Sequence, residues 1–409
     1  MIHTSNVRRA RMARGVALLA ASALVLAACG GDDDDDTAPE APSEDTAADT
    51  PSDDTTAAPA TEGEGAPAAP EGAADCAPGE VDGDLALYNW SEYIDPELKD
   101  AFAAEFGVGI TEDNYDSNEA MQPVIQAGGS GYDVIVPSDY MVSVMIDAGN
   151  LQPLNKAAIP NIGNLAPEFA SGLPYDPNGD WSVAYQWGTT GLGVDLAVTG
   201  EDVPHSWGIV FDPEMREQYN TNGEITLLND PRETIGAALK YLGYSLNTTS
   251  MDELNEAKDL VAATRDAITA FDSDQYDELL VTGETAVAHG YSGNMIVQID
   301  GADAPDQYVY FVPDEGGTRW VDNMAIPFDA PHPCTAHAFI NFLLDAENGA
   351  ALSNWNYYPS PNAAAEEFID PEVRDDPRVY PPDTSKLEFI ADTGEFEINF
   401  SDAFIEAKG

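Results

Sequence analysis

The chain has 409 residues, of which 43% are hydrophobic, and it carries 16 Lys and Arg against 74 Asp and Glu, a formal net charge of −58. The apolar content excludes a wholly disordered chain, and the length suffices for roughly two or three domains with buried cores. The charge argues against a nucleic-acid partner, because phosphates would be repelled. It is compatible with a cationic partner, and equally with the hydrated acidic surface of a salt-adapted organism.

The first residues have the pattern of an export signal. Arginines between positions 8 and 14 precede an apolar run, Val16 to Ala28, which is too short to cross a membrane. The run ends in L-A-A-C-G (26–30), which resembles the bacterial lipobox, where the cysteine is lipidated and becomes the first mature residue. We therefore expect residues 1–28 to be a lipoprotein signal peptide and Cys29 to anchor the protein to the membrane surface. The alternative is a plain signal peptide with an incidental cysteine.

Residues 29–80 are predicted to form an acidic, disordered tether. They contain a run of aspartates (32–36) and many Ala, Pro, Thr and Gly, with no Lys, Arg or aromatic residue. Such a segment repels itself and has nothing with which to build a core. A solvated charge block is preferred here over a weak Ca²⁺ site. The segment would hold a folded body away from the cell envelope.

From Val81 onward, short apolar strands alternate with amphipathic helices. Leu85 to Tyr88 is predicted to be a strand, and D-P-E (95–97) predicts a helix start with Asp as cap and Pro in the first turn. Further strands are expected at 132–136 and just before 325–327, and further helices at 142–149, from 230 and at 336–344. This alternation indicates an α/β protein with mostly parallel sheets, and its size suggests two lobes.

The sequence has no motif that supports catalysis. A nucleophile elbow, a P-loop and a dinucleotide-binding glycine motif are all absent from it. His332, Cys334 and His337 superficially resemble a metal site, but they supply only three ligands. Cys334 has a better partner in Cys76, the one other cysteine of the mature body, because an exported protein meets an oxidising environment. We therefore expect a Cys76–Cys334 disulfide that attaches the end of the tether to the body, with no metal and no cofactor.

Polar and aromatic residues collect just after successive predicted strands. They form the segments Y-N-W-S-E-Y (88–93), Y-D-S-N-E (115–119) and V-P-S-D-Y (136–140). Open α/β sheets bind their ligands at this edge, beyond the carboxyl ends of the strands. Taken singly, each aromatic residue is more often part of a core than of a ligand site.

These segments, and others that follow them, resemble the spermidine/putrescine-binding proteins of polyamine ABC transporters, in the same order over about 81–409. The matching segments are Y-N-W-S-E-Y (88–93), Y-D-S-N-E-A-M (115–121), Y-D-V-I-V-P-S (132–138), Y-Q-W-G-T-T-G-L-G-V (185–194), D-P-R-E (230–233), L-G-Y-S-L-N-T-T (242–249), A-F-D-S-D (270–274), W-V-D-N-M-A-I-P (320–327) and Y-Y-P-S-P-N (357–362).

The resemblance implies a two-lobed, type II periplasmic-binding fold whose lobes close on the ligand about hinge crossovers. Lobe 1 would comprise 81–190 plus 320–366, and lobe 2 would comprise 191–319 plus 367–409. It also implies that the chain is an extracytoplasmic binding subunit of an ABC importer and not an enzyme. Its partners would be the permease subunits and the polyamine, and we expect a monomer.

Carried over motif by motif, the resemblance implies a set of ligand-binding residues. They are Trp90, Ser91, Tyr93, Tyr140, Asp230, Glu233, Ser273, Tyr291, Trp320, Asp322 and Tyr358. Two positions depart from the family's pattern: Tyr291 stands where the family commonly has Trp, and Ile390 stands where it has Gln. The residue types suit a polyamine, because aromatic faces cover methylenes and attract cations while carboxylates take the ammonium groups.

Asp230 and Glu233 also have the spacing of a helix capping box, which alone would favour a structural role. Asp322 has no capping motif. If all three acids bind the ligand, spermidine, with three ammonium groups, should bind more tightly than putrescine, which has two. Rival interpretations are a binding protein for another small organic cation, an envelope α/β hydrolase or lyase, and a polyamine sensor.

Overall fold

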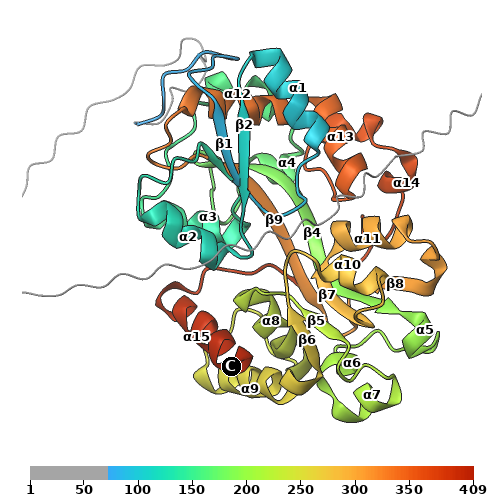
Figure 1. The fold of residues 1–409 in the computed structure, drawn as a ribbon. Coiled ribbons are helices and arrows are strands. Elements are labelled where there is room, and N and C mark those ends of the chain that lie inside the picture. The colour runs from blue at the N-terminus through green and yellow to red at the C-terminus, as the bar shows by residue number, and fades with distance from the viewer. Residues whose placement is uncertain (1–71) are drawn as a thin grey trace, which may run out of the picture. The chain divides into compact units, whose positions relative to one another are not determined.

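A computed structural model describes residues 72–409 (Figure 1). The predicted signal peptide (1–28), Cys29 and the predicted tether as far as residue 71 lie outside the described residues. The strands are β1 (Leu85–Asn89), β2 (Ile110–Asn114), β3 (Val134–Ile135), β4 (Ser182–Asp195), β5 (Ile225–Leu227), β6 (Ile268–Phe271), β7 (Val287–Tyr291), β8 (Tyr308–Phe311), β9 (Gly317–Ala325) and β10 (Leu387–Glu388). The helices are α1 (Pro96–Phe106), α2 (Asn118–Gln126), α3 (Asp139–Asp147), α4 (Pro167–Ala170), α5 (Leu196–Thr199), α6 (Gly208–Phe211), α7 (Pro213–Gln218), α8 (Pro231–Leu242), α9 (Met251–Thr264), α10 (Tyr276–Val281), α11 (Ser292–Gly301), α12 (Pro333–Leu343), α13 (Ala346–Asn356), α14 (Pro371–Arg374) and α15 (Glu397–Lys408).

The strands follow the order β2-β1-β3-β9-β4-β7-β5-β6, with β10 beside β9 and β8 beside β4. β1 pairs in parallel with β2 and β3, and β5 pairs in parallel with β6 and β7. The long strands β4 and β9 pair with each other and with β7, β8 and β3 in antiparallel fashion. Figure 1 shows β4 and β9 running from the first parallel group to the second. The parallel pairing predicted from the sequence therefore holds within each group. The crossover strands are antiparallel to their neighbours, except that β9 pairs in parallel with β10.

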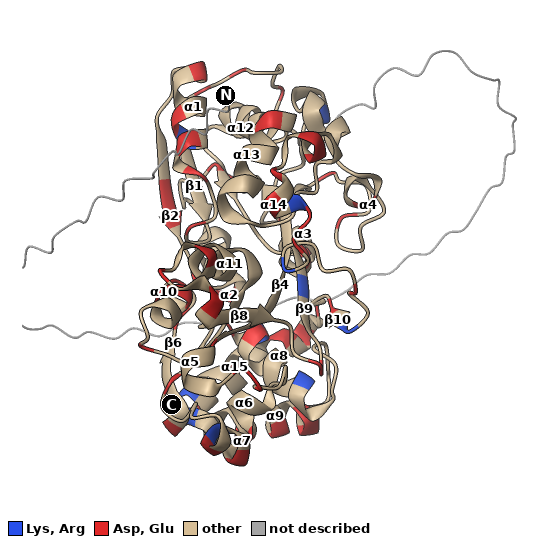
Figure 2. Ribbon diagram, turned by 90° about the vertical axis from the view of Figure 1, so that its right-hand side faces the viewer, with Lys and Arg blue, Asp and Glu red and all other residues tan. Residues whose placement is uncertain are grey.

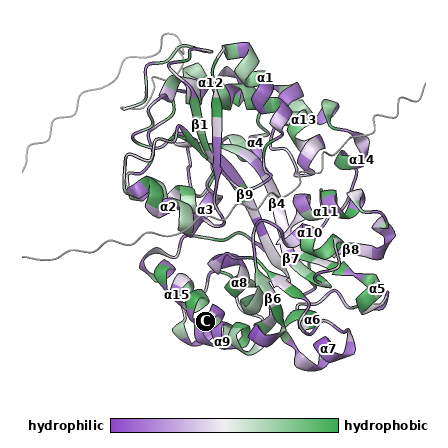
Figure 3. Ribbon diagram, viewed as in Figure 1, coloured by the Kyte–Doolittle hydropathy of each residue, from purple (hydrophilic) through white to green (hydrophobic). Residues whose placement is uncertain are grey.

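Each parallel group has its own hydrophobic core. β1 and α1 contribute Leu85, Leu87 and Phe102 to the first, and β5 and α8 contribute Leu227 and Leu239 to the second. In Figure 3, β1 has hydrophobic colouring, whereas β9 is largely hydrophilic although most of its residues are buried. Buried polar residues on a crossover strand need partners, which points to a site there.

Several predicted elements are present with small shifts. α1 has Asp95 as its N-cap, which accepts a hydrogen bond from the backbone N–H of Glu97 at 2.9 Å. α3 begins at Asp139, three residues before the predicted start, because Pro137 and Ser138 end the preceding extended segment. α12 begins at Pro333 and not at 336, since proline suits the first helical position. β3 is limited to Val134–Ile135.

Cys76 and Cys334 form a disulfide, with an S–S distance of 1.98 Å and a Cα–Cα distance of 5.3 Å. His337 is occupied nearby: its Nε2 accepts from Asn155 N–H at 2.9 Å and its Nδ1 donates to the Pro333 carbonyl at 2.6 Å. Burial lowers the pKa of His337, which fits this neutral, hydrogen-bonded ring. Within residues 72–409, no group of three His, Cys, Asp or Glu side chains is arranged to hold a metal ion.

Acidic residues occur on helices around both strand groups (Figure 2). In the part of the chain from 72 to 409, no helix is both long and apolar enough to span a bilayer.

Candidate functional site

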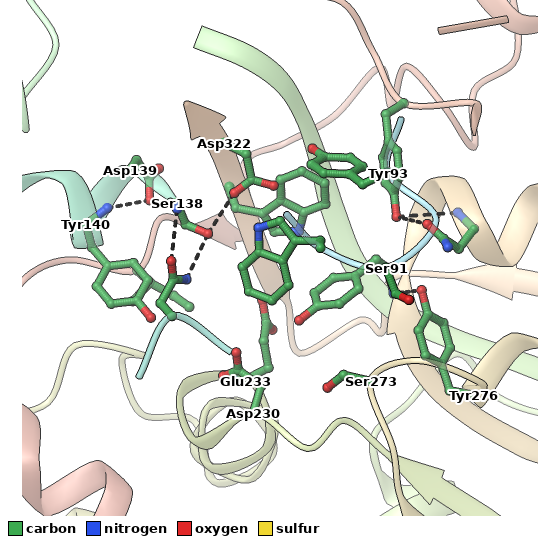
Figure 4. Close-up of a pocket in the computed structure, with 17 residues that line it drawn as sticks. Ser91, Tyr93, Ser138, Asp139, Tyr140, Asp230, Glu233, Ser273, Tyr276 and Asp322 are labelled. Atoms are coloured by element: carbon green, nitrogen blue, oxygen red, sulfur yellow. Dashed lines mark hydrogen bonds between the residues drawn. The ribbon is translucent and has the colours of Figure 1, made fainter. Parts of the chain in front are cut away.

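A pocket lies where β4 and β9 cross between the two strand groups (Figure 4). Its lining residues are Trp90, Ser91, Tyr93, Asn118, Ser138, Asp139, Tyr140, Asp230, Glu233, Ser273, Tyr276, Tyr291, Asn294, Trp320, Asp322, Tyr358 and Ile390. Every ligand-binding residue expected from the sequence is in this set, as is Ile390. The free volume left between the side chains is about 40 Å³. In this conformation, a polyamine can enter only if the walls move apart.

The fold explains why residues so distant in the sequence meet. Trp90 and Ser91 follow β1, Tyr140 follows β3, and Ser273 follows β6. Asp230 and Glu233 begin α8, directly after β5. The carboxyl ends of these parallel strands face the crossover, where open α/β sheets place their ligands.

Asp322 lies on β9 with 5% of its surface exposed. Its Oδ1 accepts a hydrogen bond of 2.7 Å from the Ser138 hydroxyl, at the start of α3. Burial raises the pKa of Asp322 to about 7, and the bond from Ser138 opposes that increase. A buried carboxylate with this pKa lacks a counter-ion, so it is suited to accept a cationic ligand.

Asp230 is the N-cap of α8. Its Oδ1 accepts from the backbone N–H groups of Arg232 and Glu233, both at 2.9 Å, which leaves Oδ2 for another partner. Burial raises the pKa of Asp230 to about 7, and the charge of Glu233 adds to the increase. The capping role suggested by the sequence is therefore real for Asp230, and it leaves one carboxylate oxygen uncommitted.

Glu233 does not complete a capping box. Its Oε1 accepts from Thr190 on β4 at 3.0 Å, and its Oε2 accepts from Thr318 on β9 at 2.8 Å. Burial raises its pKa to about 7 as well, and both threonine bonds oppose the increase. The crossover strands thus orient Glu233, with its side chain turned toward the pocket.

Aromatic rings form much of the remaining wall. Trp320 makes edge contacts with Tyr358 at a centroid distance of 5.3 Å and with Tyr291 at 5.9 Å, and Trp90 meets Tyr291 at 6.0 Å. The indole N–H groups of Trp90 and Trp320 donate to Val136 O at 2.9 Å and to Thr190 Oγ1 at 3.2 Å. With their polar edges occupied, these rings can offer their faces to methylenes and ammonium groups.

One glycine makes this packing possible. A Cβ on Gly188 would lie 2.5 Å from the Trp320 ring, closer than side chains approach each other. A larger residue at this position on β4 would displace the indole from the pocket wall.

Two further acids, Asp139 and Glu119, lie at the site or next to it. Burial raises the pKa of Asp139 to about 8, and the charge of Asp322 adds to it. Burial also raises the pKa of Glu119 to about 8, to which the charge of Asp230 contributes. The Tyr140 hydroxyl donates to Glu119 Oε1 at 2.7 Å. The region therefore holds more acids than the sequence resemblance identified.

Sequence reasoning missed some lining residues, namely Asn118, Ser138, Asp139, Tyr276 and Asn294. Asn118, Ser138 and Asp139 belong to the polar segments that follow β2 and β3, so the strand-end pattern could have found them. Asn294 could not be found in this way, because it lies within α11 and follows no strand end directly. Its Oδ1 accepts a hydrogen bond of 2.7 Å from the Tyr358 hydroxyl.

Comparison with known proteins identifies the family and the fold of the chain. The family model described as bacterial extracellular solute-binding protein matches residues 97–381. A putrescine-binding periplasmic protein of Pseudomonas aeruginosa is 37% identical over 306 residues, which cover 73% of this chain and 83% of the relative. A solved structure titled as a putative spermidine/putrescine ABC transporter from Listeria monocytogenes has a TM-score of 0.74 at 34% identity, covering 80% of this chain and 99% of the other.

A lipoprotein of Treponema pallidum has a TM-score of 0.67 at 28% identity, covering 79% of this chain and 99% of its own. These likenesses confirm the two-lobed periplasmic-binding fold predicted from the sequence. The extent of the family match, together with the relative's identity and coverage, establishes that the chain belongs to the bacterial extracellular solute-binding proteins.

Proposed function

We propose that this protein binds a polyamine outside the cytoplasmic membrane and delivers it to the permease of an ABC importer. The observation that supports this most directly is the clustering of Asp230, Glu233 and Asp322, all buried, within a wall of aromatic rings. Polyamines alternate ammonium groups with methylenes, so this wall matches both parts of the ligand. Relatives from several bacteria bear the names of putrescine- or spermidine-binding proteins, which supports the same ligand class.

The ligand would be clamped between two lobes. We assign 81–190 plus 320–366 to lobe 1 and 191–319 plus 367–409 to lobe 2, so that β4 and β9 pass from one lobe to the other. Closure brings Asp322 and the aromatic residues of lobe 1 against Asp230 and Glu233 of lobe 2. The small free volume of the pocket fits a closed arrangement that opens to admit the ligand.

Among polyamines, we propose that spermidine binds more tightly than putrescine, by about tenfold, which corresponds to about 1.4 kcal/mol. Three buried acids would pair with three ammonium groups, whereas putrescine would leave one acid unpaired or protonated. The Pseudomonas relative is named a putrescine-binding protein, and the three buried acids are the reason to expect the opposite preference in this chain.

Calorimetric titration of the full chain tests ligand class and preference together. Spermidine, putrescine and spermine are compared with a neutral diol and with amino acids at fixed pH and ionic strength. We expect the polyamines to bind and the neutral and amino-acid controls not to bind. If putrescine equals or exceeds spermidine, the three-charge interpretation is wrong although the ligand class stands. If another organic cation binds more tightly than every polyamine, the ligand class itself is wrong.

We also propose that the protein acts as a monomer, without catalysis, and is held at the outer face of the membrane through lipidated Cys29. The lipobox-like sequence before Cys29 supports this, and the Treponema neighbour is named a lipoprotein. Cys29→Ser should move the protein from the membrane fraction to the soluble fraction. Recovery of the unaltered protein in the soluble fraction would contradict the anchor.

A further inference from the structure

A second cavity adjoins the proposed polyamine pocket. Its volume is about 540 Å³, within the range of roughly 300–1,000 Å³ that is typical of small-molecule sites. It shares three lining residues with the pocket: Asp139, Tyr140 and Ile390. These side chains therefore form the partition between the two spaces.

Strand β9 lies between the two spaces, and its side chains point alternately into one and the other. Trp320 and Asp322 line the pocket, whereas Arg319 and Val321 line the second cavity. Successive side chains of a strand point to opposite faces, so one strand serves both walls. The partition is closed at its end by Ile390, which is only 6% exposed and stands where the resembling family has a polar Gln.

The lining of the second cavity is chemically complementary to an arm of a polyamine. Its lining is mostly apolar, with Phe169, Leu173 and Phe389 among its walls, and three acids lie in it: Asp139, Glu168 and Asp392. Apolar and aromatic walls suit methylenes, and carboxylates at the edge suit an ammonium group.

Arg319, the basic residue among the lining residues of this cavity, contacts aromatic rings. The Arg319 guanidinium lies between two rings, 4.6 Å from the centre of Trp187 and 5.2 Å from that of Phe389. Among the described residues, no salt bridge joins it to Asp139 or Glu168. Arg319 thus forms no direct ion pair with these acids. Burial lowers the pKa of Arg319, and the charges of Asp139 and Glu168 oppose that decrease.

We propose that this cavity is an extension of the ligand site, which accepts the additional aminoalkyl arm of a polyamine too long for the pocket, such as the tetraamine spermine. The arm passes the partition when Ile390 and Tyr140 turn aside, and its terminal ammonium group meets Glu168 and Asp392. Asp139, at the junction, faces the nitrogen that lies between the two spaces. The inference rests on the proposed polyamine function and adds to it a preference for chain length.

The test is a titration of the full chain with putrescine, spermidine and spermine, in the wild type and in variants that alter only the second cavity. Ser143 on α3 lines this cavity and not the pocket, so Ser143→Trp should fill it. We expect Ser143→Trp to weaken spermine binding by about tenfold, or about 1.4 kcal/mol, and to leave putrescine binding unchanged. The matched control is Ala148→Trp, at an exposed position just beyond the end of the same helix.

A second variant tests the charges without adding bulk. Glu168→Gln with Asp392→Asn should weaken spermine more than putrescine, and the exposed pair Glu201→Gln with Asp202→Asn is the control. Loss of spermine and putrescine binding to the same extent in both cavity variants, or no loss of either, would overturn the extension while the polyamine function stands. If the wild type binds no polyamine at all, the proposed function itself fails.

Discussion

Asp322 and the pair Asp230–Glu233 are buried to similar extents, and burial raises the pKa of each to about 7, but the protein supports them differently. Asp322 accepts from the Ser138 hydroxyl, and a hydrogen bond from Tyr93 also lowers its pKa. Asp230 accepts from two backbone N–H groups and begins a helix, and Glu233 accepts from two threonines of the crossover strands. The side chain of Asp322 therefore caps no helix. Asp230 caps α8 and Glu233 contacts both crossover strands, so we expect these two acids to contribute to stability as well as to binding.

The largest expected effect is at Asp322. Asp322→Asn should weaken polyamine binding by about 2–4 kcal/mol, the usual cost of removing one partner of a buried charge pair. The fold should survive, because the Asn oxygen can still accept from Ser138. Calorimetry with spermidine measures the loss, and Asp259→Asn, whose side chain is 77% exposed, is the control. Unchanged affinity would place Asp322 outside the site.

Binding should also depend on pH near neutrality. The three acids, with pKa values of about 7 in the unliganded protein, must be ionised to pair with ammonium groups. Below pH 7, each acid that has to release its proton weakens binding by up to about tenfold per pH unit. Affinity should therefore rise from pH 6 to pH 8 and then level off. A flat profile would contradict the raised pKa values, and Asp322→Asn should make the profile shallower.

The same groups affect stability with a definite sign. Their folded-state pKa values lie above the unfolded values of about 4, so the folded state holds protons that the unfolded state releases. Their contribution to the free energy of unfolding is thus present at pH 4 and is lost as the pH rises toward about 7. Denaturant unfolding of the unliganded protein checks this, and spermidine should restore the loss.

Substitutions at Asp230 separate its two roles. Asp230→Ala removes the cap of α8 and should lower the free energy of unfolding by about 1–2 kcal/mol, whereas Asn is a good cap and should cost less. Both variants should bind polyamine more weakly. Denaturant unfolding and calorimetry on the same samples distinguish the roles. Equal stability of the Ala and Asn variants would show that the cap contributes little.

Only part of this arrangement of acids could be predicted from the sequence. The cap at Asp230 follows from the local pattern D-P-R-E, and the strand-end segments predicted which residues would meet, because parallel strands end at one edge. The partners of Glu233 could not be predicted, since Thr190 and Thr318 lie 43 and 85 positions away in the sequence. A capping-box spacing looks the same whether the glutamate turns back to its helix or out to another strand.

The burial of Asp139 could not be predicted from the sequence either. Asp139 looks like an ordinary helix-start acid, and only the packed structure shows that it is 3% exposed and faces two cavities. The second cavity itself has no sequence signal, because it is bounded by β9, α3, α4 and the segment 389–392, which no local pattern connects.

The smallest expected effect concerns the threonines that hold Glu233. Thr318→Val removes one donor to the carboxylate at nearly constant shape, and should weaken spermidine binding by about 0.5–1.5 kcal/mol, the net value of one hydrogen bond. Thr190→Val should cost more, because the Thr190 hydroxyl also accepts from the Trp320 indole N–H. Titration of both variants beside Thr269→Val, an exposed threonine whose hydroxyl donates to Gly223 O, measures the difference. If both variants bind as tightly as the wild type, the crossover strands do not orient Glu233 for the ligand, and α8 alone positions its acids.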